Sequence, residues 1–494
     1  PYTTLFRSRV AVARGDGPRT AREPRREDHG RGEDQPRRVT ACRSGHVAPS
    51  TASDRKTSVV AEARGSLPAD GRGDAPSRGV ELCRRRDTTP PVSTLRRELG
   101  LAEAVVYGVG LILGAGIYAV VGEATALTGG SVVFSFLLAA VVAALTGLSY
   151  AELASVYPNA EGDYIYVRAA FDRPVVSDVT AFGRLAMGVV STAAVALAFA
   201  GYLSAFVDLP AIPVAVGLVV VTAVVNWWGI EFSTRLNVVF TALEVLGLLI
   251  VVWVGSGSWG QAPVFELTGG ATGLVEAGFL IFFAYLGFGS IVNLAEETED
   301  ATTTIPKAIV LSIAITTAIY VCVALSAVAL VDGAALGASS SPLALVAATG
   351  WGPTGARVLG VIALFSTANT ALILQISTSR LCYGVSKSEY QVFPAVFATV
   401  HPTRQTPHYA VALVCLATIP FLFLGDVGAV AGLANLVLLV VFALVNAALL
   451  KLRVDRPDAD RGFRTPLNVG DVSVTAVAGL LSSLALIGFY VLTW

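Results

Sequence analysis

Charged residues are scarce in this chain of 494 residues. They make up 14% of the sequence, whereas 54% of the residues are hydrophobic. Soluble domains carry roughly 25% charged residues, so the composition excludes an ordinary soluble protein. Mean hydropathy is +0.66. Helices satisfy their own backbone hydrogen bonds in lipid, so we predict an all-α polytopic membrane protein.

Residue patterns that bind metals or catalyse reactions are also missing. The five cysteines form no CxxC or Cys/His spacing, so we expect no metal site and no disulfide framework. No HExxH, phosphate-loop or GxSxG motif is present, which argues against an enzyme. None of the four histidines lies in mid-membrane. We therefore expect no cofactor, and at most a proton or sodium ion as a coupling partner.

The first part of the chain lacks apolar periodicity. Residues 1–97 contain 21 Lys and Arg against 12 Asp and Glu, and the only methionine is Met187. We expect residues 1–92 to be a disordered basic tail. A basic arm that meets anionic lipid or nucleic acid is one interpretation. Sequence translated from upstream of the true start is the favoured one, so we expect no nucleic-acid partner.

Eleven hydrophobic segments follow, each long enough to cross a bilayer, for which about 20 apolar residues suffice. A transporter domain is predicted over 93–494, with one repeat at 99–255, a second at 270–450 and a peripheral helix at 472–493. The predicted spans are 103–127, 131–156, 177–206, 211–228, 235–255, 273–295, 307–331, 356–380, 408–425, 427–450 and 472–493.

The basic residues of the loops fall almost entirely on one side of these spans. Only Arg357 lies on the other side. Basic loops face the cytoplasm, so we predict a cytoplasmic N-terminus in the plasma membrane. The residues on the basic side are Arg96, Arg97, Arg168, Arg173, Arg235, Lys307, Arg380, Lys387, Arg404, Lys451, Arg453, Arg456, Arg461 and Arg464.

Two spans are interrupted by glycine in their middle. The first carries Gly114-Ala115-Gly116, and the sixth carries Gly287-Phe288-Gly289. Each broken span begins a set of five spans. Because five is an odd number, the second set enters the membrane from the side opposite to the first. Two such sets of opposite orientation are typical of an inverted repeat, in which broken helices mark the substrate site of a secondary transporter. A helix-packing role for the glycines is the alternative.

Several separated stretches resemble the amino acid permeases of the amino acid–polyamine–organocation superfamily. The resemblance covers about residues 95–494, and the order and spacing of the stretches carry it. It implies a five-plus-five inverted-repeat core and two peripheral helices; the twelfth helix is missing here, which suggests a truncated C-terminus. The stretches are Gly110–Tyr118, Val121-Gly122, Leu148–Pro158, Gly162–Tyr166, Phe282–Phe288, Glu296-Glu297, Ile305–Ile309, Ser379–Leu381, Phe393-Pro394, His401-Pro402 and Thr406-Pro407.

The first break offers groups for both ends of an amino acid zwitterion. Backbone N–H groups at the start of the outer half-helix, around Gly114, Ala115 and Gly116, suit a carboxylate. Carbonyls that end the inner half-helix, at Ile112, suit an ammonium group. The resemblance implies that carbonyls of the sixth span also take the ammonium and that Phe283 closes over the substrate. The sixth-span residues are Phe283, Ala284, Leu286 and Gly287.

Glu244 is the notable ionisable residue at depth. A charge in mid-membrane is costly, so it should face the protein interior. Proton-coupled relatives often carry a lysine at this place in the fifth helix, and Glu244 departs from that pattern. A proton-carrying role and a structural role both stay open. Ser366 and Thr367 are the other candidates for ion coupling, because relatives hold sodium with hydroxyls of this helix; hydroxyls also bond to their own helix.

Two further features bear on selectivity and gating. Many relatives have an acid where this chain has Gly289, and its absence favours neutral or branched substrates. Glu296 or Glu297 with Arg380 could form a gate of ion pairs on the basic side, with ordinary anchoring as the alternative. Glu152 lies on the same side, and gating and ordinary anchoring are again the two interpretations.

These features together predict secondary active transport of amino acids by alternating access. Proton-coupled symport of neutral amino acids is the favoured form. A sodium-coupled symporter or an exchanger is an alternative, and a channel or a non-transporting receptor is an alternative of another class. A channel needs a continuous polar pore, which the few polar residues at depth do not suggest.

Overall fold

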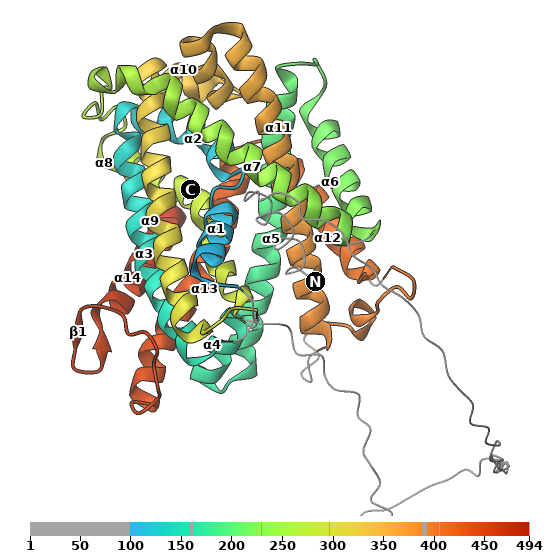
Figure 1. The fold of residues 1–494 in the computed structure, drawn as a ribbon, viewed down its shortest axis with the longest axis vertical. Helices are drawn as coiled ribbons and strands as arrows, with labels where there is room; N and C mark the ends of the chain where they lie inside the picture. Colours follow the sequence, from blue (N-terminus) through green and yellow to red (C-terminus); the bar gives the residue numbers. More distant parts are fainter. Residues whose placement is uncertain are drawn as a thin grey trace, which may run out of the picture. The chain divides into compact units, whose positions relative to one another are not determined.

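A computed structural model describes residues 99–158, 162–228, 230–295, 297–387, 393–404 and 406–493, and the predicted tail 1–92 lies outside them. The membrane-spanning helices dominate this part of the chain (Figure 1). They are α1 (Leu101–Ile112), α2 (Gly116–Thr128), α3 (Val132–Val156), α5 (Pro174–Ser204), α6 (Ala211–Trp228), α7 (Ile230–Gly255), α8 (Gly270–Ile281), α9 (Ala301–Leu330), α11 (Pro342–Lys387), α12 (His408–Leu422), α13 (Val427–Asp455) and α14 (Val474–Thr493).

Nine segments of the described chain are long and apolar enough to cross a bilayer, and α1 and α12 are shorter apolar helices. One of the nine segments contains both α2 and α3, and α12 occupies the ninth predicted span. The described helices therefore match the predicted set of spans, with α1 and α2 sharing the first.

Short elements connect the spans, and the sequence patterns did not predict them. The helix α4 lies at the basic side between α3 and α5. A small antiparallel ladder pairs Asn468 with Ser473 just before α14. The short elements are α4 (Asp163–Phe171), α10 (Gly333–Ala338), the 3-10 helices η1 (Gly129–Ser131), η2 (Ser256–Gln261) and η4 (Ala395–Ala398), and the strands β1 (Asn468–Val469) and β2 (Val472–Ser473).

The two predicted breaks take different forms. The first is an interruption between Ile112, where α1 ends, and Gly116, where α2 begins. The second is a change of pitch: α8 ends at Ile281 and continues directly as the 3-10 helix η3 (Phe282–Leu294). The predicted interruption at Gly287 is thus replaced by a tighter helix that begins earlier. Long 3-10 segments are uncommon and often mark a functional hinge.

The eighth predicted span begins earlier than expected. Helix α11 bends at Gly352, whose φ of 73° is in the left-handed region, and Pro353 follows. Glycine adopts this φ without steric cost, and proline supplies no N–H for the preceding turn. The bend separates a short first part of α11 from the long part that carries Ser366.

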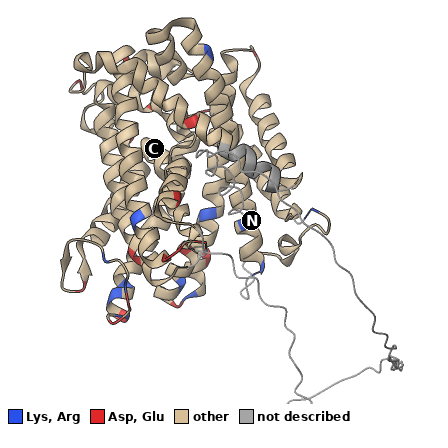
Figure 2. Cartoon of the chain, viewed as in Figure 1, with Lys and Arg blue, Asp and Glu red and all other residues tan. Residues whose placement is uncertain are grey.

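Charged residues gather at one end of the helices (Figure 2). We call this the basic end; it contains Arg168 in α4, Lys451 and Arg453 in α13, and Arg456 and Arg461 in the loop that follows. Between the ends, α1 packs against α9 and η3, α3 against α9, and α5 against α11 and α13. The broken helices α1 and η3 therefore lie beside each other and beside α9.

Candidate functional site

The two broken helices meet backbone to backbone. A Cβ atom on Gly116 would lie 2.7 Å from the Cα of Ala284, and one on Gly287 would lie 2.2 Å from the main-chain oxygen of Leu111. Real side chains cannot approach a backbone so closely, so both positions require glycine. The glycines that interrupt the hydrophobic pattern thus place the end of α1 and the start of α2 directly against η3.

Main-chain groups at this junction bond to side-chain hydroxyls. The Tyr320 hydroxyl, on α9, lies 2.7 Å from the Ile112 oxygen and 3.0 Å from the Ala284 oxygen. The Ala115 N–H donates to Thr370 Oγ1 on α11 at 3.0 Å. Ile112 and Ala115 flank the helix interruption, where end groups lack intrahelical partners, whereas Ala284 lies within η3.

Tyr320 is fully buried and its ring is held on two sides. The ring centroids of Phe136 and Tyr285 lie 5.8 Å and 5.3 Å from that of Tyr320. Neither Tyr320 nor Thr370 was predicted as a site residue. One available signal was a tyrosine inside the apolar run of α9, since a buried tyrosine hydroxyl usually needs a partner. The other was the position of Thr370 beside the polar cluster predicted in the eighth span.

The remaining residues predicted to bind substrate lie at the same junction. Ile112, Ala115, Phe283 and Ala284 are buried, with Phe283 at 4% exposure. Gly114, Leu286 and Gly287 are partly buried, and a Cβ on Gly114 would lie 3.3 Å from Thr370 Oγ1. The structure therefore brings the predicted substrate residues of the two broken spans together.

Glu244 is buried, at 1% exposure, and contacts α11. Its Oε1 accepts a short hydrogen bond from Ser366 Oγ. Its main-chain oxygen accepts from the Tyr118 hydroxyl of α2 at 3.0 Å. The Thr367 hydroxyl instead donates to Ala363 of its own helix, at 2.7 Å. Of the three residues predicted to couple an ion, the structure therefore joins Glu244 and Ser366.

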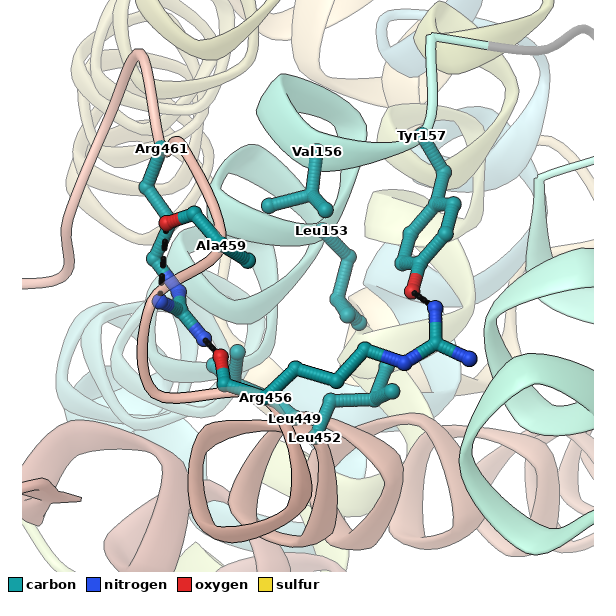
Figure 3. A pocket seen from close by; sticks show the side chains of 8 residues that line it. All are labelled: Leu153, Val156, Tyr157, Leu449, Leu452, Arg456, Ala459 and Arg461. Carbon is teal, nitrogen blue, oxygen red and sulfur yellow. Dashed lines mark hydrogen bonds between the residues drawn. The ribbon is translucent and has the colours of Figure 1, made fainter.

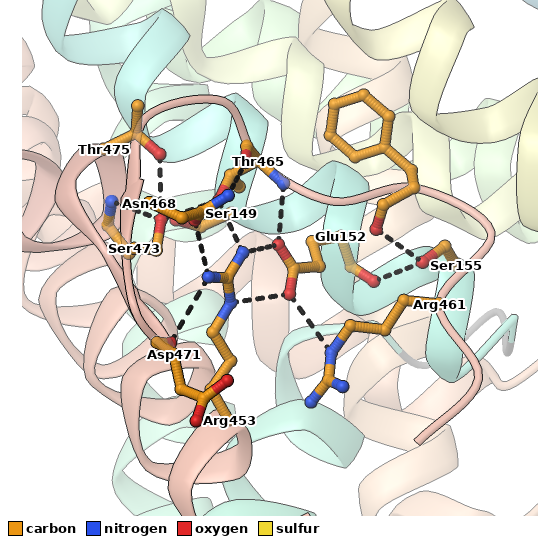
Figure 4. A network of polar contacts seen from close by, with 12 residues as sticks. Ser149, Glu152, Ser155, Arg453, Arg461, Thr465, Asn468, Asp471, Ser473 and Thr475 are labelled. Atoms are coloured by element: carbon orange, nitrogen blue, oxygen red, sulfur yellow. Dashed lines mark hydrogen bonds and ion pairs between the residues drawn. The ribbon is translucent and has the colours of Figure 1, made fainter. Parts of the chain in front are cut away.

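Glu152 is the centre of a buried ionic cluster at the basic end (Figure 4). Its carboxylate accepts from Arg453 Nε at 2.8 Å and Nη2 at 2.5 Å, and Arg461 Nε lies 3.2 Å from it. The Thr465 N–H donates to the same carboxylate at 2.8 Å. The Ser155 hydroxyl, one turn further along α3, donates to the main-chain oxygen of Glu152 at 2.7 Å. The cluster ties the end of α3 to α13 and the loop before α14.

Of the predicted gate of ion pairs, only Glu297 and Arg380 lie within the described residues. Glu296 lies outside the described residues. The Glu297 main-chain oxygen accepts from the Leu99 N–H at 3.0 Å, and its side chain is partly buried, as is that of Arg380. Within the part of the chain that the structure describes, Glu297 and Arg380 form no ion pair with each other.

A second ion pair at the basic end joins α4 to α5. Arg184 Nε lies 2.9 Å from Asp163 Oδ2. Tyr166 on α4 is fully buried, and burial together with the Asp163 carboxylate raises the pKa of its phenol well above the ordinary value. The unpredicted helix α4 is thus anchored by charge and by a neutral buried tyrosine.

A small pocket also lies at the basic end, between α3, α13 and the loop after α13 (Figure 3). Its volume is about 10 Å³, which is room for one water molecule. Arg456 Nη1 donates to the Tyr157 hydroxyl across it at 2.7 Å. A pocket of this size is too small for an amino acid.

Known proteins match the chain along most of its length. The family model described as amino acid permease matches residues 99–494. The chain is 32% identical to an uncharacterised transporter of Mycobacterium tuberculosis over 367 residues, 73% of this chain and 81% of that protein. It is 26% identical to a branched-chain amino acid permease of Bacillus subtilis over 399 residues, 76% and 84% of the two chains. It is 26% identical to cationic amino acid transporter 7, chloroplastic, of Arabidopsis thaliana over 388 residues, 72% and 65% of the two chains.

Proposed function

The chain belongs to the amino acid permease family, and from that premise we propose that it carries neutral amino acids across the plasma membrane in symport with protons. Membership establishes the coarser statement: the protein is a multi-pass transporter of amino acids or related solutes, not an enzyme, with the family's five-plus-five inverted-repeat fold. The substrate class, the coupling ion and the site residues are our proposal.

The junction of the broken helices supports a zwitterion site. Two main-chain oxygens, of Ile112 and Ala284, and one N–H, of Ala115, bond there to side-chain hydroxyls, and Ile112 and Ala115 stand at the interruption between α1 and α2. An ammonium has three N–H donors and a carboxylate is a strong acceptor, so a zwitterion can satisfy all three groups. The N-terminus of α2 adds a positive dipole for the carboxylate. We propose that the substrate lies between these groups, with Phe283 closing over it.

The absence of an acidic side chain at Gly289 supports neutral substrates. A Cβ there would lie 3.6 Å from the Tyr150 ring, which is ordinary contact, so the space does not by itself demand glycine. The Bacillus relative is named for branched-chain amino acids and the Arabidopsis relative for cationic ones. A cationic side chain needs a buried counter-charge, and position 289 does not supply one.

We further propose that Glu244 carries the coupled proton. Its carboxylate is buried between α7 and α11, and the Ser366 hydroxyl is bonded to it. A buried carboxylate is costly when charged, so its protonated form and its charged form are stable in different surroundings. The Tyr118 hydroxyl bonds to the main chain of Glu244, so a movement of Glu244 is transmitted to α2 and the junction. Basic loops typically face the cytoplasm, and this supports a basic end inside the cell.

Uptake by purified protein in proteoliposomes tests the proposed function. Labelled leucine, isoleucine, alanine, lysine and arginine are supplied in turn under an imposed proton gradient, a sodium gradient or neither. We expect saturable uptake of neutral amino acids that an inward proton gradient accelerates. Stimulation by sodium alone would replace the proton by sodium, and saturable uptake of none of the five would contradict the proposal.

Glu244→Gln tests the coupling residue. The amide keeps the shape and a hydrogen bond to Ser366 but cannot ionise. We expect leucine counterflow without a gradient to persist and stimulation by a proton gradient to disappear. Ser483→Ala, at a buried hydroxyl bonded within α14, is the control and should keep both. Retained gradient stimulation in Glu244→Gln would remove Glu244 from the coupling mechanism.

A further inference from the structure

We propose that the hydroxyls of Tyr320 and Thr370 take the places of the substrate's ammonium and carboxylate groups when the transporter is empty. Tyr320 bonds to the two carbonyls that we assign to the ammonium. Thr370 bonds to the Ala115 N–H that we assign to the carboxylate. The inference rests on the proposed substrate site and adds two residues that compete with substrate for it.

The Tyr320 hydroxyl is a weaker partner for the carbonyls than an ammonium would be. It lies 2.7 Å from the Ile112 oxygen and 3.0 Å from the Ala284 oxygen, yet it carries a single hydrogen for both. An ammonium group has three hydrogens and a positive charge, and charge-assisted hydrogen bonds are stronger than neutral ones. The hydroxyl therefore lowers the cost of the empty site without preventing an ammonium from displacing it.

Thr370 is related to the carboxylate in the same way. Its Oγ1 accepts from Ala115 at 3.0 Å, at the residue that precedes α2. A hydroxyl oxygen is neutral, whereas a carboxylate also gains from the positive end of the helix dipole. The two hydroxyls come from α9 and α11, so opposite ends of the zwitterion would displace side chains of two different helices.

Displacement of Tyr320 requires helices to move. The phenol is rigid, so its hydroxyl can leave the carbonyls only when the ring moves. The ring is fully buried and packs against Phe136 and Tyr285. Entry of the ammonium must therefore shift α9 relative to α1 and η3, whereas Thr370 can withdraw by a side-chain rotation. Substrate binding would thus be linked to a rearrangement at the broken helices.

This arrangement predicts different effects on loaded and empty transporters. Without the Tyr320 hydroxyl, the empty site loses the side-chain donor shared by the two carbonyls, which leaves the buried Ile112 carbonyl at the end of α1 unpaired, while the loaded site is unchanged. Substrate binding becomes tighter because the empty transporter, from which binding starts, is less stable. The return of the empty carrier, which net uptake needs and exchange does not, becomes slower, because the closed empty state through which it passes lacks this donor.

Leucine binding and transport by Tyr320→Phe test the inference. We expect the leucine dissociation constant to fall roughly fivefold, which corresponds to about one unpaired buried acceptor. We expect net uptake into leucine-free vesicles to fall by a similar factor relative to exchange into leucine-loaded vesicles. Tyr285→Phe is the matched control, because that hydroxyl lies near the Phe136 oxygen and Thr317 rather than the carbonyls of the junction.

Two leucine analogues separate the roles of the hydroxyls. Tyr320→Phe should strengthen inhibition by 3-methylbutylamine, which lacks the carboxylate, and leave inhibition by 4-methylpentanoate unchanged. Thr370→Val should show the reverse pattern, and Thr370→Ser, which keeps the hydroxyl, should behave like the wild type.

Weaker leucine binding by Tyr320→Phe, with net uptake and exchange reduced together, would mean that Tyr320 only positions the carbonyls and would overturn the inference. Absence of leucine binding and uptake in the wild type would instead overturn the proposed function from which it starts.

Discussion

At the scale of single residues, Glu152 shows how the buried charge at the basic end is neutralised. The carboxylate is fully buried and faces two arginines that are themselves buried, at 2% and 5% exposure for the side chains of Arg453 and Arg461. Buried charges are tolerated when they are paired and hydrogen-bonded. The cluster fits the anchoring interpretation of Glu152, because its partners belong to α13 and the following loop.

Removal of this charge should destabilise the folded protein. Glu152→Gln leaves Arg453 and Arg461 without a counter-charge, which typically costs about 3–5 kcal/mol. We expect a clearly lower melting temperature of the purified protein in detergent. Asp455→Asn on α13, the helix that carries Arg453, is the control, because Asp455 and its partner Lys451 are exposed at 45% and 41% and exposed pairs contribute little. Equal melting temperatures for the two variants would argue against a buried ionic anchor.

A carboxylate at position 289 should widen the substrate range. A Cβ at Gly289 would be in ordinary van der Waals contact with Tyr150, so the backbone contact there does not itself require glycine. The added charge can pair with a cationic side chain. We expect lysine and arginine to become inhibitors of leucine uptake, and Gly289→Asn to serve as the uncharged control. Inhibition by lysine that is the same in both variants would count against charge as the determinant.

Some of these residues could be found from sequence and others could not. Glu244 stands out because a lone acid in an apolar run must be buried, and the structure buries it. Thr370 did not stand out, since its partner Ala115 is 255 residues away and only the folded chain brings them together. The Glu152 partners were missed for the same reason, because Arg453 is 301 residues distant.

At the scale of elements, the spans were predictable and the form of the second break was not. Long apolar runs fix where helices cross the membrane, and the described helices follow them. The transition from α8 to η3 begins at Phe282, within an apolar stretch whose residues favour neither pitch. The cause is tertiary: the tight contact of Gly287 with Leu111 and the bond from Tyr320 to Ala284 act on this segment. Short helix α4 was missed because its pattern is too brief.

The backbone contact between the broken helices should not tolerate even one methyl group. Gly287→Ala places a Cβ 2.2 Å from the Leu111 oxygen, which forces α1 and η3 apart. We expect leucine uptake to fall at least about tenfold with folded protein still present, because small displacements at a binding site are costly. Gly217→Ala in α6 is the control, since no heavy atom lies within 4 Å of the added group. Uptake by Gly287→Ala at the level of Gly217→Ala would contradict a site at this junction.

At the scale of the whole molecule, one hydrogen bond of the junction joins helices that alternating access should move apart. The family-level expectation is that spans one, two, six and seven rock against spans three, four, eight and nine. The bond from Ala115 to Thr370 joins α2 to α11, and that from Tyr118 to Glu244 joins α2 to α7. The bond from Ala115 to Thr370 therefore crosses between the two sets of spans, and that from Tyr118 reaches the fifth span, which belongs to neither set. The bonds of Tyr320 to Ile112 and Ala284 lie within one set, inside which the entry of the ammonium shifts α9.

The most direct measurement follows protons and amino acid together. Purified protein is reconstituted in vesicles that contain a pH-sensitive dye, and labelled leucine is added outside without an imposed gradient. We expect leucine entry to acidify the lumen in the wild type, and Glu244→Gln to exchange leucine without any pH change. Leucine entry into wild-type vesicles at constant lumenal pH would contradict proton symport through this transporter.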